Sequence, residues 1–394
     1  MTVFRQRGLR AAAAGICLAA LFGAQACGAE NPPSGTGDAG RTEAVQRALD
    51  ATVRGGFPGA QAVLTTEAGD RTVTAGVGDI ATGAPIPRDA RVRIGSNTKT
   101  FVATVVLQLV AEGKVELDAP VERYLPGVVR GSGNDGNRIT VRHLLQHTSG
   151  LPDYLAGGDP ELRAERGTAQ LEVDTEAVRL RRYDPAELVH LAMTMPPRYE
   201  PGTRAVYTNT NYVLLGMLIQ QTTGRSAADE ITARIIEPLG LRDTWFPAAG
   251  ETGIRGPHPV GYQDIDGTRV DFTDLDPSWA DAAGAMIATG ADLNRFFRAL
   301  LGGRLLPAAQ LDEMRRTVPF DRMPGAGYGL GLIHLPTSCG KDVWGHGGSI
   351  PGFETRNGVT ADGHAVTITV NQLPTSEENV VLVQQAFDAA VCSQ

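Results

Sequence analysis

Lysine is scarce in this chain of 394 residues, since Lys99, Lys114 and Lys341 are its only lysines and the other basic residues are arginines. The chain has no Gly-x-Ser-x-Gly motif, which argues against an α/β-hydrolase. No internal repeat is visible, and no apolar run is long enough to span a bilayer as a helix. Acidic residues outnumber basic ones by 44 to 36, giving a net charge of −8. We therefore expect no nucleic-acid partner.

What is present begins with a leader pattern. Three arginines precede an apolar run over 11–22, and Ala24-Gln25-Ala26 follows it. This layout is typical of a secretory signal peptide, so we expect residues 1–26 to be removed and the protein to be secreted. Cleavage after Ala26 would leave Cys27 at the new terminus, where a lipid anchor to the outer face of the membrane is the alternative, although Ala24 and Gln25 fit a lipoprotein signal poorly. Residues 27–40 predict a flexible linker.

Cys339 and Cys392 are the other two cysteines of the exported part. An oxidising compartment favours a disulfide between them, and two free buried thiols are the alternative.

The periodicity of apolar residues predicts an α+β fold. We expect an antiparallel sheet with flanking helices, built from both chain ends (41–116 and 278–394), and an inserted helical domain (117–277). Expected helices cover 42–53, 97–112, 140–147, 184–194, 210–223, 226–237 and 378–390; expected strands are a hairpin within 59–78 and the segments 328–335, 342–346, 353–360 and 365–371.

Ser96-Asn97-Thr98-Lys99 opens the expected helix over 97–112. Lys99 is one helical turn from Ser96 and on the same face, so its amine can reach the hydroxyl. A partly desolvated lysine can take the proton of a serine, and the helix N-terminus can face a developing oxyanion. The alternative is an ordinary serine cap followed by a surface lysine. Ser338-Cys339-Gly340-Lys341 has the same spacing, but its position between two strands predicts a hairpin turn.

Two further segments carry groups suited to the same chemistry. Tyr207-Thr208-Asn209 precedes the helix over 210–223, so a phenol and a carboxamide can point the same way; packing and capping are the alternative.

Trp344-Gly345-His346-Gly347-Gly348-Ser349 is expected at the end of a strand and the start of a tight turn. Gly347 and Gly348 would let a ligand lie against the strand edge, the Ser349 N–H could complete an oxyanion hole, and His346 could donate to an anionic group or to Tyr207. The alternative is a hairpin turn with a solvated histidine.

His143 and His147 have a spacing suited to a metal ion, but no glutamate of a zinc-protease helix and no third ligand is evident. We expect no metal and no other cofactor.

Together these segments resemble the serine penicillin-recognising enzymes, in which Ser-x-x-Lys is followed by Tyr-x-Asn and then by Lys- or His-x-Gly on a late strand. The resemblance is to the branch of D-alanyl-D-alanine carboxypeptidases, class C β-lactamases and related esterases. Matching segments run through most of the chain: 93–96, 147–151, 207–212, 278–279 with 283–286, and 328–332.

The resemblance implies a role for each matching residue. Ser96 would be the acylated nucleophile, Lys99 its activator and Tyr207 the general base and acid. Asn209 would hold the substrate amide, the N–H groups of Ser96 and Ser349 would form the oxyanion hole, His346 would replace the more common lysine, and Trp279 would line the cleft. The separation of Cys339 and Cys392 looks like that of a disulfide in secreted carboxypeptidases of this branch.

Two departures from the family pattern concern the substrate. Gly347 stands where the carboxypeptidases usually have threonine, and Ile333 stands where close relatives have arginine. Both changes weaken the expected binding of a free carboxylate.

The sequence thus predicts a monomeric D-alanyl-D-alanine carboxypeptidase-like enzyme that acts on peptidoglycan-type or D-amino-acid peptides and is acylated by β-lactams. The alternatives are an esterase or weak β-lactamase, and a cell-envelope binding protein without turnover.

Overall fold

The computed structural model describes residues 36–155, 170–173, 175–320 and 323–393. The predicted signal peptide, Cys27 and most of the predicted linker lie outside these residues. Helix α1 (Thr36–Arg54) begins inside the predicted linker 27–40, so the last residues of that segment are helical, which corrects the prediction. Within the described part of the chain, no helix has both the length and the hydropathy needed to cross a bilayer.

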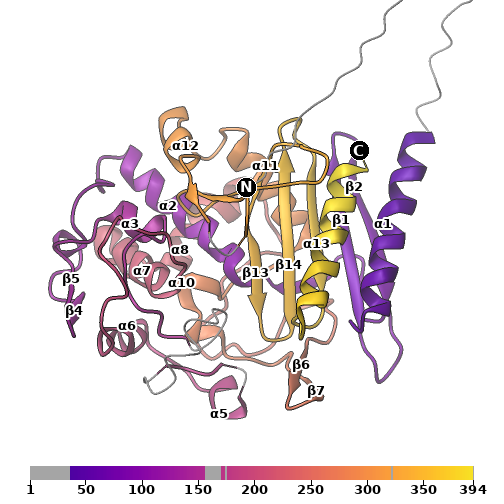
Figure 1. The fold of residues 1–394 in the computed structure, drawn as a ribbon, viewed down its shortest axis with the longest axis horizontal. Helices are drawn as coiled ribbons and strands as arrows, with labels where there is room; N and C mark the ends of the chain where they lie inside the picture. Colours follow the sequence, from indigo (N-terminus) through magenta and orange to yellow (C-terminus); the bar gives the residue numbers. More distant parts are fainter. Residues whose placement is uncertain (1–35, 156–169, 174, 321–322, 394) are drawn as a thin grey trace, which may run out of the picture.

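A nine-stranded antiparallel sheet joins the two ends of the chain, which confirms the predicted fold class (Figure 1). Strand β1 (Gly59–Thr66) pairs with β15 (Ala365–Val370), placing Ala60 opposite Val370. The strands follow the order β2-β1-β15-β14-β12-β11-β10-β9, and β13 also pairs with β14. The remaining bounds are β2 (Gly69–Gly76), β9 (Val318–Pro319), β10 (Gly327–Tyr328), β11 (Ile333–Leu335), β12 (Val343–Gly345), β13 (Gly347–Ile350) and β14 (Phe353–Thr360).

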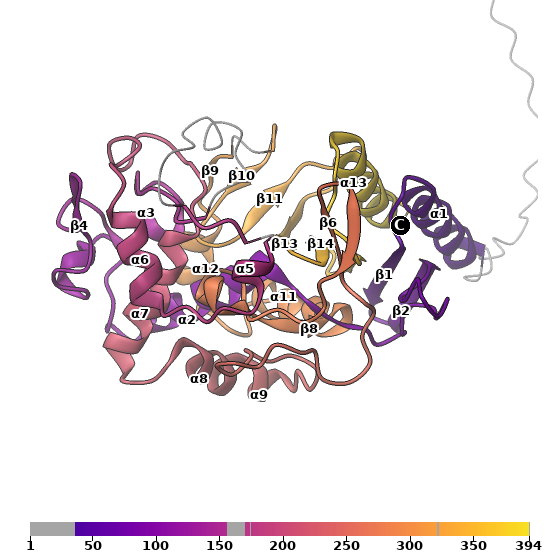
Figure 2. The same ribbon diagram turned by 90° about the horizontal axis from the view of Figure 1, so that it is seen from below.

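Helices cover both faces of this sheet, and the alternation of side chains along the strands explains how. Val63 and Thr367 face helix α11 (Gly290–Leu301), because a Cβ at Gly290 would lie against their side chains. Their neighbours along the strands point to the other face, where α1 and α13 (Glu377–Cys392) pack. Figure 2 shows α1 and α13 on the side of the sheet away from α11. Strand β1 is therefore buried on both faces, and most of its residues are apolar or small, as burial on both faces favours.

Helix α2 (Thr98–Ala111) is buried along most of its length, as predicted. Its Phe101 stacks on Phe296 of α11, with ring centroids 3.6 Å apart. It also packs against α7 (Thr210–Thr223) of the helical region. A 3-10 turn, η1 (Gly95–Asn97), leads into α2, so the start of α2 lies between the sheet and the helical region.

The helical region contains the predicted helices, and α7 has the predicted bounds. The helix predicted over 140–147 is α3 (Val141–Leu145) and ends early because His147 adopts a φ of 58°. The helix predicted over 226–237 is α8 (Ala227–Ile231), a π turn (Thr232–Ile236) and α9 (Glu237–Leu239). The other elements are α5 (Glu176–Arg179), α6 (Pro185–Met193), α10 (Asp281–Gly284), α12 (Ala308–Met314), the 3-10 turns η2 (Val121–Arg123) and η4 (Pro277–Trp279), and the short strand pairs β3–β8 (Arg91–Arg93, Ile287–Thr289), β4–β5 (Arg130–Gly131, Asn134–Asp135) and β6–β7 (Tyr262–Ile265, Thr268–Asp271).

Two strand predictions near the C-terminus are wrong in detail. The segment 328–335 is a hairpin of β10 and β11, in which Gly331 has a φ of 75° that favours glycine. His346 does not stand at the start of a tight turn. It lies between β12 and β13, which run on in the same direction and keep the same register against β14. The reversal comes later, at Gly352, which has a φ of 93°.

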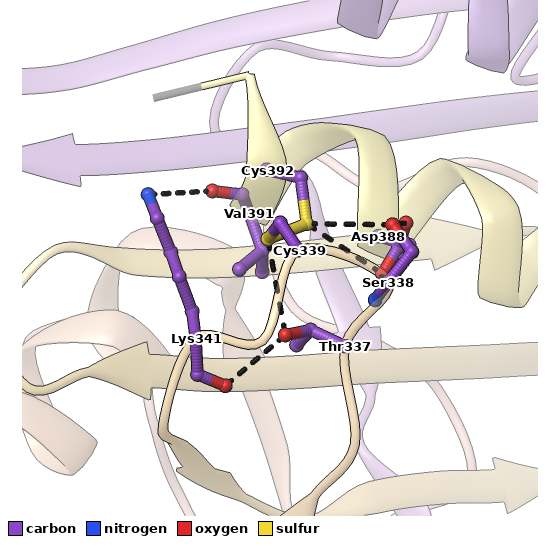
Figure 3. Close-up of a disulfide and its surroundings, with 7 residues drawn as sticks. All are labelled: Thr337, Ser338, Cys339, Lys341, Asp388, Val391 and Cys392. Carbon is purple, nitrogen blue, oxygen red and sulfur yellow. Dashed lines mark hydrogen bonds between the residues drawn. A yellow bond between two sulfur atoms is a disulfide. The ribbon is translucent and has the colours of Figure 1, made fainter. Parts of the chain in front are cut away.

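The structure joins Cys339 to Cys392, with Cα atoms 5.8 Å apart (Figure 3). Ser338 to Lys341 form the turn between β11 and β12, as predicted for this second Ser-x-x-Lys segment. Ser338 donates hydrogen bonds to Asp388 from its backbone and hydroxyl, and Lys341 Nζ donates to the Val391 carbonyl at 3.2 Å. These contacts and the disulfide tie the turn to the end of α13.

Candidate active site

Ser96 lies in η1, directly before α2. The conformation of this turn favours glycine at position 95. Gly95 has a φ of 49°, and a Cβ there would lie 2.9 Å from the Ser349 nitrogen. The turn therefore packs directly against strand β13. Ser96 is half-buried, whereas Asn97 and Lys99, which follow it in the chain, are fully buried.

The Lys99 amine donates hydrogen bonds to three oxygen atoms. These are Ser96 Oγ at 3.0 Å, Asn209 Oδ1 at 2.9 Å and the Ala283 carbonyl at 2.7 Å. An ammonium group has three N–H donors, so the three acceptors match a charged lysine held in one orientation. The predicted contact between Lys99 and Ser96 is thus present, and the lysine is not a surface residue.

The ring of Tyr207 lies beside this ammonium, with its centroid 4.8 Å from Lys99 Nζ. Tyr207 is buried, and the ring of His147 packs against it with centroids 4.1 Å apart. The positive charge of Lys99 favours negative charge that develops on a neighbouring phenol during proton transfer. The Ser96 hydroxyl and the Lys99 amine therefore meet at the start of α2, beside the ring of Tyr207 from a separate segment.

Asn209 is held by Asp153, which the sequence did not single out. One oxygen of Asp153, Oδ2, accepts hydrogen bonds from the Asn209 backbone N–H and from Asn209 Nδ2, both at 3.0 Å. This fixes the carboxamide so that its oxygen faces Lys99. The contact of Asn209 with a substrate amide stays a prediction, since one amide N–H remains for it.

His346 differs from its predicted arrangement. It is buried, and its Nε2 lies 3.0 Å from the hydroxyl of Tyr328, while its Nδ1 lies 2.6 Å from the Gly347 carbonyl. Burial lowers the pKa of His346 to about 3, and the charges of Lys99 and Arg356 act in the same direction. His346 is therefore uncharged at neutral pH and is paired with Tyr328 instead of with Tyr207.

His147 completes this buried polar group. Its Nδ1 accepts a hydrogen bond from the Thr208 N–H at 3.3 Å, so the proton of the neutral ring belongs on Nε2, which lies 3.2 Å from the Tyr328 hydroxyl. Tyr328 thus bridges the two histidines behind Tyr207. His143 belongs to the cap of α3, and no cluster of three His, Cys, Asp or Glu side chains in the described ranges is arranged to hold a metal ion.

Strand β13 has one free edge beside the nucleophile. Strand β11 pairs with residues 343–345 only, so in the described part of the chain residues 347–350 are paired on the β14 side alone. Gly348 is needed here, because a Cβ at that position would lie 1.9 Å from the Ile94 carbonyl oxygen. The close packing places the Ser349 nitrogen against Gly95, the residue before Ser96. The oxyanion hole formed by the N–H groups of Ser96 and Ser349 stays a prediction.

Trp279 is the predicted residue that fits its expected place least well. It is 4 % exposed and belongs to the core, and its backbone carbonyl accepts a hydrogen bond from Tyr154. The place of Trp279 on the cleft wall therefore stays a prediction.

The comparisons with known proteins agree with this geometry. The model of the Beta-lactamase family matches residues 42–390, so the chain belongs to the Beta-lactamase family of serine hydrolases and penicillin-recognising proteins. The chain is 31 % identical over 296 residues to "Esterase EstB" of Burkholderia gladioli, covering 67 % of this chain and 72 % of that protein. It is 29 % identical over 269 residues to "Penicillin-binding protein 4" of Amycolatopsis lactamdurans, covering 66 % of each chain, which is just under two thirds of that relative.

Solved structures are similar over nearly the whole described chain. A D-stereospecific amidohydrolase from Streptomyces sp. superimposes with a TM-score of 0.79 and 41 % identity, covering 90 % of this chain and 99 % of that one. The D-amino acid amidase from Ochrobactrum anthropi SV3 gives a TM-score of 0.75 and 28 % identity, covering 90 % and 98 %.

Proposed function

We propose that this serine hydrolase cleaves amide or peptide bonds on the carbonyl side of D-configured residues, through an acyl-enzyme on Ser96. The observation that carries the proposal is the 3.0 Å contact between Lys99 Nζ and Ser96 Oγ beside the ring of Tyr207. The amidohydrolase and amidase relatives support D-configured substrates. Cleavage of D-alanyl-D-alanine peptides, as in a carboxypeptidase, is one reaction of this class.

Acylation needs one proton transfer from Ser96 and one to the leaving group. Tyr207 acts as a phenolate, which the neighbouring Lys99 ammonium stabilises, and it becomes a neutral phenol by taking the serine proton as Ser96 Oγ attacks the carbonyl carbon. The N–H groups of Ser96 and Ser349 bind the oxyanion. Tyr207 then gives its proton to the departing amine as the C–N bond breaks, which leaves the acyl ester on Ser96.

Hydrolysis of the ester repeats these steps with water. Tyr207 removes a proton from the attacking water, and the same proton returns to Ser96 Oγ when the ester bond breaks. Asp153 and Asn209 keep Lys99 in place throughout, since they fix one of its three acceptors.

An esterase is the second candidate function. The 31 % identity with an esterase over two thirds of the chain favours it. Esters need less help for the leaving group than amides, because an alkoxide or phenolate departs more readily than an amine, so the same Ser96 chemistry would serve.

Hydrolysis of D- and L-phenylalanine amide and of a nitrophenyl ester tests these candidates, with Ser96→Ala as the matched control. The proposal expects Ser96-dependent release of ammonia from the D-amide and much less from the L-amide. Equal rates on both enantiomers, or none above the Ser96→Ala variant, would remove the D-specific proposal. Cleavage of the ester alone would favour the esterase.

We also propose that the protein is exported, with residues 1–26 removed. The arginine-led apolar segment over 11–22 supports this, as does the close approach of Cys339 and Cys392. The N-terminal sequence of protein recovered from the culture medium or from the membrane distinguishes plain secretion from a lipid at Cys27. An unprocessed N-terminus in the cytoplasm would contradict export.

A further inference from the structure

The face of the sheet next to the free edge of β13 carries an ion pair. The register pairs Gly347 with Arg356 and Ser349 with Glu354 across β13 and β14. Paired residues, and residues two apart on one strand, share a face of a sheet. Arg356 and Glu354 therefore lie on the same face as Gly347 and Ser349, whereas Gly348 faces Ile94 on the opposite side.

The guanidinium of Arg356 occupies the space that a side chain at position 347 would need. A Cβ on Gly347 would lie 2.9 Å from Arg356 Nη1, so the guanidinium would have to shift to admit a side chain there. A threonine at this position, the family pattern, would therefore displace the end of the arginine side chain. Glycine at position 347 leaves the guanidinium room to lie over the strand.

Most of the hydrogen-bond donors of Arg356 remain available. Its Nη1 donates to the Thr355 carbonyl at 3.1 Å and forms the ion pair with Glu354. A guanidinium has five N–H groups, and in the described part of the protein no hydrogen bond from Nε or Nη2 is present. The Arg356 side chain is 21 % exposed, while that of Glu354 is 2 % exposed, so the arginine and not its partner can meet a ligand.

The other two basic groups near β13 cannot serve an anion. Lys99 uses its three N–H donors on Ser96, Asn209 and Ala283. His346 uses its ring nitrogens on Tyr328 and the backbone of Gly347, and it is uncharged at neutral pH.

The distances along β13 suit a substrate that binds along the free edge. Ser349 and Gly347 are two residues apart, which is about 7 Å along a strand. One amino-acid residue beyond the scissile carbonyl spans about 3.5 Å, and a guanidinium hydrogen-bonds a carboxylate at about 2.8 Å. A carbonyl oxygen at the Ser349 N–H therefore leaves the carboxylate of the next residue within reach of Arg356.

We propose that Arg356 is a specificity-determining residue that binds the free carboxylate of the leaving group, held in place by Glu354. The inference rests on the proposed function and narrows it. Among D-configured substrates, the enzyme prefers peptides whose residue after the scissile bond ends in a carboxylate over the same peptides ending in an amide.

Two peptides that differ only in charge test this preference, namely an N-acyl-D-Ala-D-Ala and its C-terminal carboxamide. Each peptide is assayed for hydrolysis and for protection of Ser96 against a fluorescent penicillin. We expect the wild-type protein to favour the acid. In Arg356→Gln the acid-to-amide ratio should fall by about tenfold or more, because a charge-assisted hydrogen bond is lost. Arg356→Lys should retain part of the ratio, and Glu354→Gln should lower it, because the guanidinium loses the charge that holds it in place.

Arg91→Gln is the matched control, because Arg91 pairs with Asp243 and is 24 % exposed but lies away from β13. Its ratio should equal that of the wild type. An unchanged ratio in Arg356→Gln, or better use of the acid by that variant, would overturn the inference; the second result would mean that the guanidinium blocks the edge. If the wild type hydrolyses neither peptide, the carboxypeptidase-like reaction of the proposed function fails, whereas the protection ratio still decides the role of Arg356. If neither peptide protects Ser96 against the penicillin, the inference about Arg356 is also overturned.

Discussion

Asp153 accepts two hydrogen bonds from Asn209 through a single carboxylate oxygen, and the second amide atom of Asn209 accepts one from Lys99. The nucleophile is thus connected to a buried carboxylate through Lys99 and one carboxamide. This chain of contacts explains how Lys99 keeps one orientation beside Ser96.

Replacement of Asp153 by asparagine tests this connection. An asparagine oxygen is a weaker acceptor, and its amide can turn a donor toward Asn209, so Lys99 loses a fixed partner. We expect kcat to fall by about 10- to 100-fold, as for the loss of a charge-assisted hydrogen bond. Steady-state kinetics and the rate of labelling by a fluorescent penicillin measure this loss of activity. The exposed Asp312→Asn variant is the control, and an Asp153→Asn enzyme with wild-type kcat would refute the role.

His346 predicts a pH dependence of stability. Its pKa is about 3 in the folded protein, against 6.5 for an ordinary histidine. Between these values the unfolded chain binds a proton that the folded protein does not, so this group makes stability rise with pH by up to about 1.4 kcal/mol per unit. Above pH 6.5 its contribution is constant. Urea unfolding at several pH values should show that His346→Gln loses less stability in acid than wild type does, with the variant His190→Gln at an exposed position as control. Parallel curves would contradict this.

Asp281 predicts a pH dependence of stability with the opposite sign. Burial raises the pKa of this carboxyl to about 6, from 3.8. Its favourable contribution is therefore full below pH 3.8 and is lost as the pH rises through about 6. Asp281→Asn removes a buried charge at high pH, and asparagine also tolerates the φ of 40° found here. We expect the variant to be more stable by about 2 kcal/mol at pH 8 and equal to wild type at pH 4. Destabilisation at pH 8 would show that the ionised carboxylate is needed.

Removal of the disulfide should lower the stability of the protein without lowering its catalytic activity. Cys339 and Cys392 close a loop with a sequence separation of 53 residues, so removing the bond should cost about 4 kcal/mol or less by loop entropy. A Cys339→Ser and Cys392→Ser double variant should unfold at lower urea concentration and keep its kcat, since neither residue belongs to the site. Reduced wild-type protein is the control. Equal unfolding midpoints with and without reductant would mean that the bond does not form in the protein.

The sequence predicted the fold well because its long elements carry strong local patterns. The apolar run of α2 and the alternation in β1 and β15 identify elements that are buried on several sides. It failed where glycine allows the chain to reverse, as at Gly331, because a run of apolar residues and glycines can form one strand or two. It also placed a reversal at Gly347, where the strand continues.

The site was predictable only as far as its motifs extend. Ser96, Lys99 and Tyr207 come together as their spacing suggested. Asp153 and Arg356 have no local signal, since a lone acid in a loop and a lone arginine on a strand are ordinary residues. Their importance comes from cross-strand register and from contacts over long sequence separations, which a single sequence does not contain. The burial of His346 likewise depends on contacts over long sequence separations, which a single sequence does not contain.

The most direct test of the central claim is the mass of the protein after brief reaction with benzylpenicillin and an acid quench. If Ser96 is the nucleophile, the wild type gains one penicilloyl group, and peptide mapping assigns it to Ser96, while Ser96→Ala gains none. An adduct that persists in Ser96→Ala, or that maps to another residue, would contradict the account.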